Sequence, residues 1–308
     1  MTSPVAAGDA PVARRRRAPS ALRVLGRSLP LVPAVILLAV FMLGPVIWSI
    51  YGSFTNTALT GRRARDPQFI GFDNYVRLVH DPLFPKSLWL TIVFVILSAV
   101  VGQNILGFAV ASMNRAVGPV LRAIVGTIVI AAWVLPEIVA AFSLYAFFGE
   151  AGTLEGLFRS VGLSAPNMLY EHPMTSVILA NIWRGTAFSM LVYQAALADV
   201  PPELTEAAQV DGASPWNRLT RVTLPVIRRT IVTNLMLTTL QTLSVFTLIW
   251  VMTAGGPGTD SSTLPILAYQ MAFKFSQVGY GTAIATVMLL IGAVFSIAYI
   301  RVLRPEVD

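Results

Sequence analysis

The chain alternates long apolar stretches with shorter polar segments. Six stretches contain about 20 or more mainly apolar residues, enough to cross the ~30 Å hydrocarbon layer of a bilayer as a helix. Lipid offers no hydrogen-bond partner to an open backbone, so helices that pair their own N–H and C=O groups are favoured there. We therefore expect an all-α membrane protein with six transmembrane helices. The predicted spans are Leu29–Tyr51, Leu88–Met113, Ala123–Phe148, Pro173–Leu197, Thr230–Thr253 and Val278–Ile300.

The composition supports a membrane protein and excludes several kinds of chemistry. Of 308 residues, 55% are hydrophobic and 12% are charged, whereas roughly a quarter of the residues in a soluble globular protein are charged. The chain has no cysteine, which excludes disulfides, thiolate metal sites and cysteine nucleophiles. Two histidines, His80 and His172, leave little material for a histidine metal site. We expect no catalytic residues and no metal ligands.

The basic residues predict the orientation, because cytoplasmic loops carry an excess of Lys and Arg. Both chain ends in the cytoplasm would place fourteen of the 22 basic residues inside and seven outside, with Arg184 inside the fourth span. The first outer loop, with five basic residues, runs against this trend, but long loops carry less weight in the rule. The sequence thus predicts a multi-pass protein of the inner (plasma) membrane with cytoplasmic termini.

Residues 1–28 form a basic segment rich in Ala, Pro and Arg. A cleaved signal peptide fits poorly, because the following apolar stretch is long and no small-residue cleavage pattern follows Trp48. Nucleic-acid binding is a weaker interpretation than a disordered cytoplasmic tail beside anionic lipid. We therefore expect a transmembrane domain over 29–303, a short cytoplasmic tail over 304–308, and no nucleic-acid partner.

Residues 198–229 form the only sizeable hydrophilic segment that faces the cytoplasm in this topology. Pro201 and Pro202 suit the first turn of a helix, and Gly212 suits its left-handed C-terminal residue. Ser214 is a predicted N-cap, followed by a second short helix through about Val222 that ends at Leu224-Pro225. The spacing fits either an ordinary solvated loop or a two-helix finger that docks in the groove of another protein.

The loop resembles the EAA signature of binding-protein-dependent ABC importer permeases. The residues that carry the resemblance are Glu206, Ala207, Ala208, Asp211, Gly212, Leu224 and Pro225. The resemblance implies a type I ABC importer permease fold, in which this segment is a coupling helix that enters a cleft on a cytoplasmic ATPase subunit. Glu206 would then contact the ATPase, Gly212 would provide the bend, and the two alanines would permit close packing.

A second set of residues is similar to the carbohydrate-importer, maltose-permease-like branch of that family. These are Thr253–Pro257, Thr263, Tyr269, Ala272-Phe273, Gly279, Gly281, Leu135-Pro136 and Trp183–Gly185. The resemblance covers roughly residues 30–305, and the sequence as a whole looks closest to the first permease of actinobacterial trehalose importers. It implies a carbohydrate substrate, with a disaccharide such as trehalose as the candidate.

Polar residues in the fifth span share one helical stripe: Asn234, Thr238, Gln241 and Thr242, with Val245. Such residues either face a substrate or form hydrogen bonds between helices. The resemblance implies a mid-membrane substrate site formed by Thr238, Gln241 and Thr242 together with Arg184, Gly185 and Phe188. Arg184 could equally pair with Glu137, the only acid predicted within hydrocarbon.

The chain has no ATP-hydrolysing motif, because Gly255–Gly258 lacks the Lys and Ser/Thr of a P-loop. The resemblance implies that ATP and Mg bind partner ATPase subunits and that this chain binds no cofactor. The implied partners are a second homologous permease, an ATPase dimer, an extracytoplasmic sugar-binding lipoprotein and membrane lipid. Two alternatives remain: an ion-gradient-driven secondary transporter, and an ABC permease for a non-sugar solute such as glycerol phosphate.

Overall fold

The computed structural model describes residues 31–164 and 166–303. Within these ranges the regular elements are helices, and an isolated antiparallel bridge joins Thr55 to Phe69. The predicted all-α class is confirmed. The predicted tails, 1–28 and 304–308, lie outside the described residues, so the domain boundaries stay a prediction.

Two compact units divide the chain, Met1–Trp48 and Ser49–Asp308. The described part of the first unit is a single apolar helix built from α2 (Val32–Leu38), the π-helical turn η2 (Ala39–Leu43) and the start of α3 (Gly44–Ser53). It carries no Asp, Glu, Lys or Arg. This helix coincides with the first predicted span.

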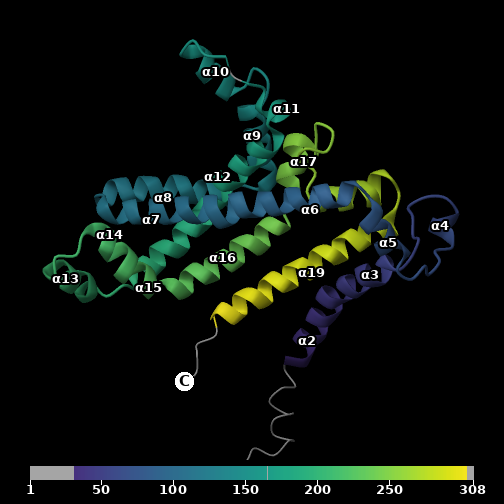
Figure 1. Cartoon of the computed structure of the whole chain (residues 1–308), viewed down its shortest axis with the longest axis horizontal. Coiled ribbons are helices and arrows are strands. Elements are labelled where there is room, and N and C mark those ends of the chain that lie inside the picture. The colour runs from purple at the N-terminus through teal and green to yellow at the C-terminus, as the bar shows by residue number, and fades with distance from the viewer. Residues whose placement is uncertain (1–30, 165, 304–308) are drawn as a thin grey trace, which may run out of the picture. The chain divides into compact units, whose positions relative to one another are not determined.

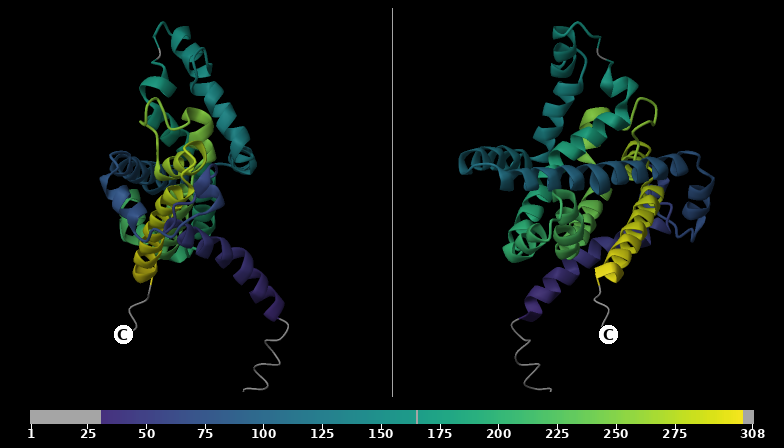
Figure 2. Two further views of the ribbon diagram at one scale, coloured as in Figure 1. Left: turned by 90° about the vertical axis from the view of Figure 1, so that its right-hand side faces the viewer. Right: turned by 60° about the vertical axis from the view of Figure 1, so that its left-hand side comes forward.

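The second unit contains the remaining helices. Before the centre of the chain these are α4 (Arg62–Arg65), α5 (Asp73–His80), α6 (Leu83–Phe94), η3 (Val95–Gln103), α7 (Asn104–Ala116), α8 (Pro119–Val134), α9 (Glu137–Phe148), α10 (Thr153–Ser160) and α11 (Met168–Glu171). They continue with α12 (Pro173–Ala198), α13 (Pro202–Val210), α14 (Pro215–Arg218), η4 (Leu219–Thr223), α15 (Leu224–Val226), α16 (Arg228–Leu243), α17 (Thr247–Thr253), α18 (Leu264–Tyr269), η5 (Gln270–Lys274) and α19 (Val278–Leu303). Figures 1 and 2 show α6, η3 and α7 as one long helix, with α8 beside its C-terminal half.

Three helices of the described residues are long and apolar enough to cross a membrane: Val32–Ser53, Leu83–Ala116 and Val278–Leu303. The number rises to five if each of two bent helix pairs is one span. The fourth predicted span forms α12, whose 26 residues extend about 39 Å at 1.5 Å per residue. It is not among the three helices because its polar residues lower its mean hydropathy. The six-span count therefore stays a prediction.

The third and fifth predicted spans are broken rather than continuous. The first break lies at Leu135-Pro136, where α8 (Pro119–Val134) and the run Glu137–Ser160, which contains α9 and α10, differ in direction by 105°. Leu135 is extended, with ψ of 133°, because the ring of the following proline disfavours α-helical backbone at the preceding residue. The second break, after Leu243, turns the axis by 48° between α16 and α17.

The core of the second unit is organised around α12, which packs against α7, η3, α8, α16 and α17. Small residues permit the closest approach. A Cβ atom built on Gly107 would lie 2.4 Å from the Cβ of Ser189, so α7 and α12 approach each other at this glycine. Close contact through small residues is typical of helix packing in membranes.

Candidate functional site

The segment between α12 and α16 folds as two short helices joined by a tight bend. The N–H of Ala213 donates to the C=O of Ala208 (2.9 Å), and the N–H of Gly212 donates to the C=O of Gln209 (3.1 Å). This pair of bonds is the Schellman motif, which requires a left-handed residue at its turn. Gly212 supplies it, with φ of +77°. The predicted role of Gly212 at the helix end is confirmed.

The second helix begins as predicted but ends later. The Ser214 hydroxyl accepts a hydrogen bond from the N–H of Asn217 (3.3 Å) and caps α14. The helical run then continues through η4 and α15 to Val226, so the prediction that Leu224-Pro225 ends it is wrong. Pro225 follows directly after the π-helical turn η4 (Leu219–Thr223), so the regular α-helical hydrogen-bond pattern is already interrupted where this proline lacks an N–H.

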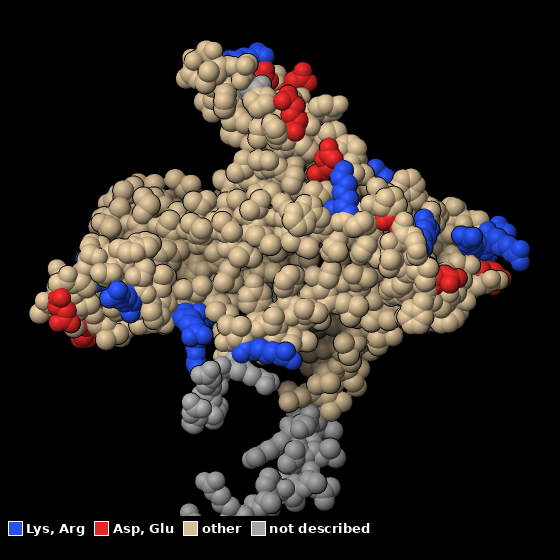
Figure 3. Space-filling view, viewed as in Figure 1, with Lys and Arg blue, Asp and Glu red and all other residues tan. Residues whose placement is uncertain are grey.

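The surface of the two-helix segment combines charge with exposed apolar side chains. Val210 is 88% exposed and Trp216 is 70% exposed. Figure 3 shows both acidic and basic side chains at this end of the second unit. Of the predicted coupling residues, Glu206, Ala207, Asp211, Gly212 and Pro225 are exposed, whereas Ala208 and Leu224 are half-buried. Such a surface is suited to contact with another protein.

A polar cavity of about 240 Å³ lies where α12, α16, η3, α8 and α9 meet. It contains five of the six predicted substrate residues: Arg184, Gly185, Phe188, Gln241 and Thr242. Its other lining residues are Gln103, Trp133, Glu137, Asn181, Ser244 and Val245. The polar stripe of the fifth span and the Trp-Arg-Gly segment of the fourth therefore meet at one site.

The two charged residues of the cavity do not pair with each other. The ion pairs of the described residues are Lys86–Asp260 and Arg159–Glu155. Glu137 instead accepts a hydrogen bond from the N–H of Leu248 (3.3 Å), at the start of α17. The Nε atom of Arg184 is buried and has no hydrogen-bond partner among the described residues. The ion pair with Glu137, one of the two roles considered for Arg184, is therefore not among the ion pairs of the described residues.

Gly185 and Gln103 are matched in shape. A Cβ atom on Gly185 would lie 2.2 Å from the Cδ of Gln103, so the Gln103 side chain occupies the space that a larger residue would fill. Gln103 Nε2 donates to the C=O of Asn181 (3.0 Å), which holds the amide in place. Trp133 and Phe188 add an aromatic wall, with ring centroids 6.1 Å apart.

Thr238, the sixth predicted substrate residue, does not line the cavity. It is 1% exposed, and its hydroxyl donates to the C=O of Asn234 (2.9 Å) and accepts from Asn104 Nδ2 (3.3 Å). The side chain of Asn104 also accepts from Tyr193 and Asn234, and Asn234 donates to Ser189. We call these five side chains, from α7, α12 and α16, the buried polar network. For Thr238 the structure therefore shows a hydrogen bond between helices in place of a position in the cavity.

Trp133 and Asn181 line the cavity but were not among the residues predicted from the sequence. Trp133 lies near the end of α8, which packs against α12 and places the Trp133 ring beside Phe188. Asn181 lies on α12 one turn before Gly185, on the same face. Its polarity inside an apolar stretch was the available signal.

The chain matches one protein family and is similar to several transport permeases over most of its length. Residues 103–308 match the family described as "Binding-protein-dependent transport system inner membrane component". The sulfoquinovosyl glycerol transport system permease protein SmoG of Agrobacterium fabrum is 31% identical, over 90% of this chain and 89% of that protein. The trehalose transport system permease protein SugA of Mycobacterium tuberculosis is 34% identical, over 87% of this chain and 84% of that protein.

Solved structures agree with this chain at the level of fold. A bacterial ABC transporter involved in the import of the acidic polysaccharide alginate superposes with a TM-score of 0.78 at 24% identity, covering 93% of this chain and 99% of that one. A second structure of a bacterial alginate ABC transporter, in complex with an alginate-pentasaccharide-bound periplasmic protein, gives a TM-score of 0.77 over 91% of this chain and 95% of that one. The fold is therefore that of an ABC importer permease.

Proposed function

Because the chain belongs to the family of binding-protein-dependent transport system inner membrane components, we propose that it is a permease subunit of an ATP-driven carbohydrate importer. The substrate would be a disaccharide-sized sugar, and trehalose is the candidate. The observation that carries this proposal is the cavity beside α12, where Arg184, Gln103 and Asn181 lie with an aromatic wall.

The cavity has the chemistry that a sugar requires. Hydroxyl groups both donate and accept hydrogen bonds, and Gln, Asn, Thr and Arg side chains offer both kinds of partner. The faces of Trp133 and Phe188 suit the apolar side of a sugar ring. Relatives of this chain are named for trehalose, for trehalose and maltose, and for sulfoquinovosyl glycerol, which supports the carbohydrate class.

The charge of the cavity argues against a phosphorylated substrate. Arg184 and Glu137 are its only charged lining residues, and their formal charges cancel. A glycerol phosphate dianion would enter without a net positive charge to offset it. Glu137 is also the only carboxylate in the lining, whereas ion-driven transporters usually place several ionisable groups along their pathway.

The cavity is small for a complete site. Ligand pockets commonly measure about 300–1,000 Å³, and this one measures about 240 Å³. We therefore propose that a second, homologous permease supplies the remaining wall, with the pathway running between the two subunits. An extracytoplasmic sugar-binding protein would deliver the ligand to the face opposite α13.

The two-helix segment is the proposed contact with an ATPase dimer. Glu206 and the exposed Val210 would enter the ATPase surface, and the Schellman turn at Gly212 would hold α13 and α14 at a fixed angle. Closure of the ATPase dimer around ATP and Mg would then move α12 and α16, and the cavity would open to alternate sides of the membrane.

Reconstitution of the chain with its candidate partners tests this proposal. The full complex in liposomes should take up a disaccharide only when ATP is inside and binding protein is outside. Single cysteines at Glu206 and Val210 should crosslink to the ATPase subunit, whereas a cysteine at Leu157, on the distant α10, should not. Uptake by the purified chain alone, driven by an ion gradient, would refute the proposal in favour of a secondary transporter.

Arg184→Ala in the same complex tests the cavity itself. We expect a loss of sugar uptake with the ATPase subunits still bound, because Arg184 lies on α12 and far from α13. Arg228→Ala, which removes an exposed arginine outside the cavity, is the matched control. Equal uptake in both variants would contradict the assignment of the cavity to the substrate.

A further inference from the structure

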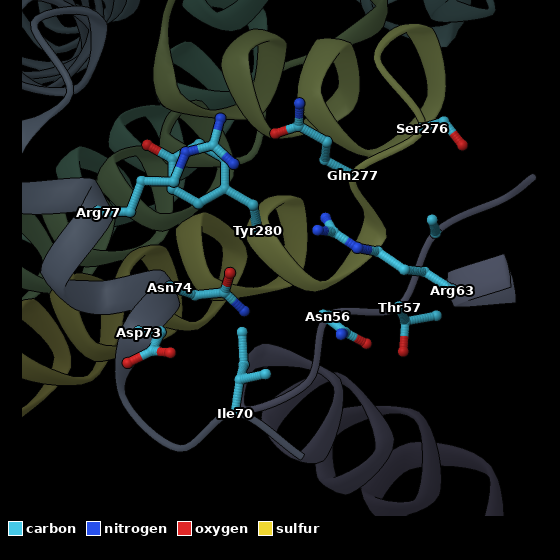
Figure 4. A pocket seen from close by; sticks show the side chains of 11 residues that line it. Asn56, Thr57, Arg63, Ile70, Asp73, Asn74, Arg77, Ser276, Gln277 and Tyr280 are labelled. Carbon is cyan, nitrogen blue, oxygen red and sulfur yellow. The ribbon is translucent and has the colours of Figure 1, made fainter. Parts of the chain in front are cut away.

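A second polar cavity, of about 290 Å³, lies beside the N-terminal end of α19. Figure 1 shows α4 and α5 at the opposite end of the second unit from α13 and α14. The cavity is formed by the connections on either side of α4, by α4 and α5, by the connection between η5 and α19, and by the first turn of α19. The lining residues are Asn56, Thr57, Ala58, Arg63, Ile70, Asp73, Asn74, Arg77, Ser276, Gln277 and Tyr280 (Figure 4).

Internal hydrogen bonds fix the walls of this cavity. Asn74 is buried, and its Nδ2 donates to the carbonyl oxygens of Ser53 and Thr55, both at 2.8 Å. The N–H of Gly279 donates to the carbonyl of Thr57 (2.9 Å). A Cβ atom on Gly279 would lie 2.0 Å from the oxygen of Thr55, so the absence of a side chain there lets the loop approach α19. The cavity is therefore preformed.

Two arginines line the cavity without a carboxylate partner. Arg63 makes no hydrogen bond or ion pair within the described residues, and Figure 4 shows its guanidinium extended into the cavity toward Gln277 and Tyr280. The guanidinium carbon of Arg77 lies 4.2 Å from the centre of the Tyr280 ring. The Tyr280 hydroxyl donates to Asp81 (2.7 Å), which fixes the ring beneath Arg77.

One acid lines the cavity with the two arginines. Asp73 lies in the first turn of α5, where the positive end of the helix dipole stabilises its carboxylate. The lining therefore keeps a formal charge of +1. In addition, Gln277 Oε1 is buried and has no hydrogen-bond partner among the described residues. The cavity thus offers two unpaired cations and one buried acceptor that needs an N–H or O–H donor.

We propose that this cavity receives an acidic side chain of the extracytoplasmic binding protein, whose carboxylate would lie between Arg63 and Arg77. This inference rests on the proposed function, which places this end of the molecule outside the membrane. A guanidinium pairs well with a carboxylate, and a backbone N–H beside the acid would satisfy Gln277.

The surroundings of the cavity favour a protein partner over a lipid headgroup. Phe69 and Phe72, on either side of the lining residue Ile70, are 68% and 69% exposed. Both rings contact Phe54, with centroid distances of 6.2 and 5.3 Å. Arginine beside exposed aromatic rings is the composition enriched in protein interfaces. A phosphodiester would also leave Gln277 Oε1 without a donor, because its oxygens only accept.

Docking of the sugar-loaded binding protein on the complete transporter in nanodiscs tests the inference. Arg63→Glu and Arg77→Glu should each weaken docking about 10-fold or more, since a like charge would replace an attractive one. Arg62→Glu is the matched control, because Arg62 lies on the same short helix, is exposed and does not line the cavity. It should change docking less than about 3-fold, as expected for a charge at the rim.

Each outcome decides between explanations. Equal losses in all three variants would indicate a general effect of charge and overturn the inference, as would unchanged docking in Arg63→Glu. A loss that appears only in nanodiscs with anionic lipid would assign the cavity to a headgroup instead. Retention of the ATPase subunits on the purified variants shows that they are folded. Failure of the unaltered transporter to bind any extracytoplasmic protein would instead refute the proposed function.

Discussion

A single methyl group at Gly185 should disturb the cavity beside α12, the proposed sugar site, more than its size suggests. In Gly185→Ala the new Cβ would lie 2.2 Å from Cδ and 2.4 Å from both terminal atoms of Gln103. These atoms are the far end of a flexible side chain, so Gln103 must rotate away and lose its bond to the Asn181 carbonyl. Overpacking costs about 1–3 kcal/mol and the lost hydrogen bond about 1 kcal/mol.

The gain in helix propensity offsets only part of this cost. Replacing glycine with alanine inside a helix stabilises it by about 1 kcal/mol. We therefore expect Gly185→Ala to lower the free energy of unfolding by about 1–3 kcal/mol. If the Gln103 amide contacts the sugar, its displacement should also weaken sugar binding about 10-fold, since a lost hydrogen bond of about 1.4 kcal/mol corresponds to that factor.

Gly126→Ala provides the matched control. Gly126 lies inside α8, and a Cβ atom there has no neighbour within 4 Å. This variant should be as stable as the unaltered protein or more stable, with normal uptake. Thermal unfolding of the purified complex and sugar uptake into liposomes measure both effects. If Gly185→Ala matched Gly126→Ala in both assays, the argument from the Gly185–Gln103 contact would fail.

Three further predictions follow from the same structure. Gly212→Pro should keep binding-protein docking but uncouple ATP hydrolysis from sugar uptake. Proline cannot adopt the φ of +77° that Gly212 has, and it has no N–H to donate to the C=O of Gln209. The control is Gly162→Pro: Gly162 follows α10 and has a similar φ of +76°, and its replacement should leave ATPase coupling normal. Asn104→Leu should lower the free energy of unfolding by about 1–3 kcal/mol, measured by thermal unfolding, because it leaves buried donors of the polar network unpaired. In a double-mutant cycle on stability, Arg184→Gln and Glu137→Gln should show a coupling energy well below the roughly 3–5 kcal/mol lost when a buried ion pair is broken, because the two side chains form no ion pair. A coupling of that size would show that they pair.

Local rules predicted the two-helix segment well. Proline at a helix start, glycine in left-handed backbone and serine as an N-cap each depend on a few neighbouring residues. The end of the second helix was predicted too early, because Pro225 was treated as a stop, whereas the helical run continues through it to Val226. The periodicity of polar residues also brought α12 and α16 to one cavity.

Other features depend on contacts between distant residues and could not be predicted from one sequence. Thr238 and Thr242 share a stripe, but only the second reaches the cavity, because Asn104 on α7 occupies the space beside Thr238. Trp133 lines the cavity because α8 packs against α12, a contact between helices about 50 residues apart in the sequence. The continuous third and fifth spans were predicted from composition, which does not register a change in helix direction.

The buried polar network determines which parts of the subunit can move during transport. The single side chain of Asn104 joins α7 to both α12 and α16 by hydrogen bonds. If these bonds broke in an apolar interior, no water would be present to replace them. Sliding these three helices past one another would therefore break several bonds together, and they should tilt as a rigid block. The bends at Leu135-Pro136 and after Leu243 lie at the edge of that block, and we expect any change in helix direction during transport to occur there.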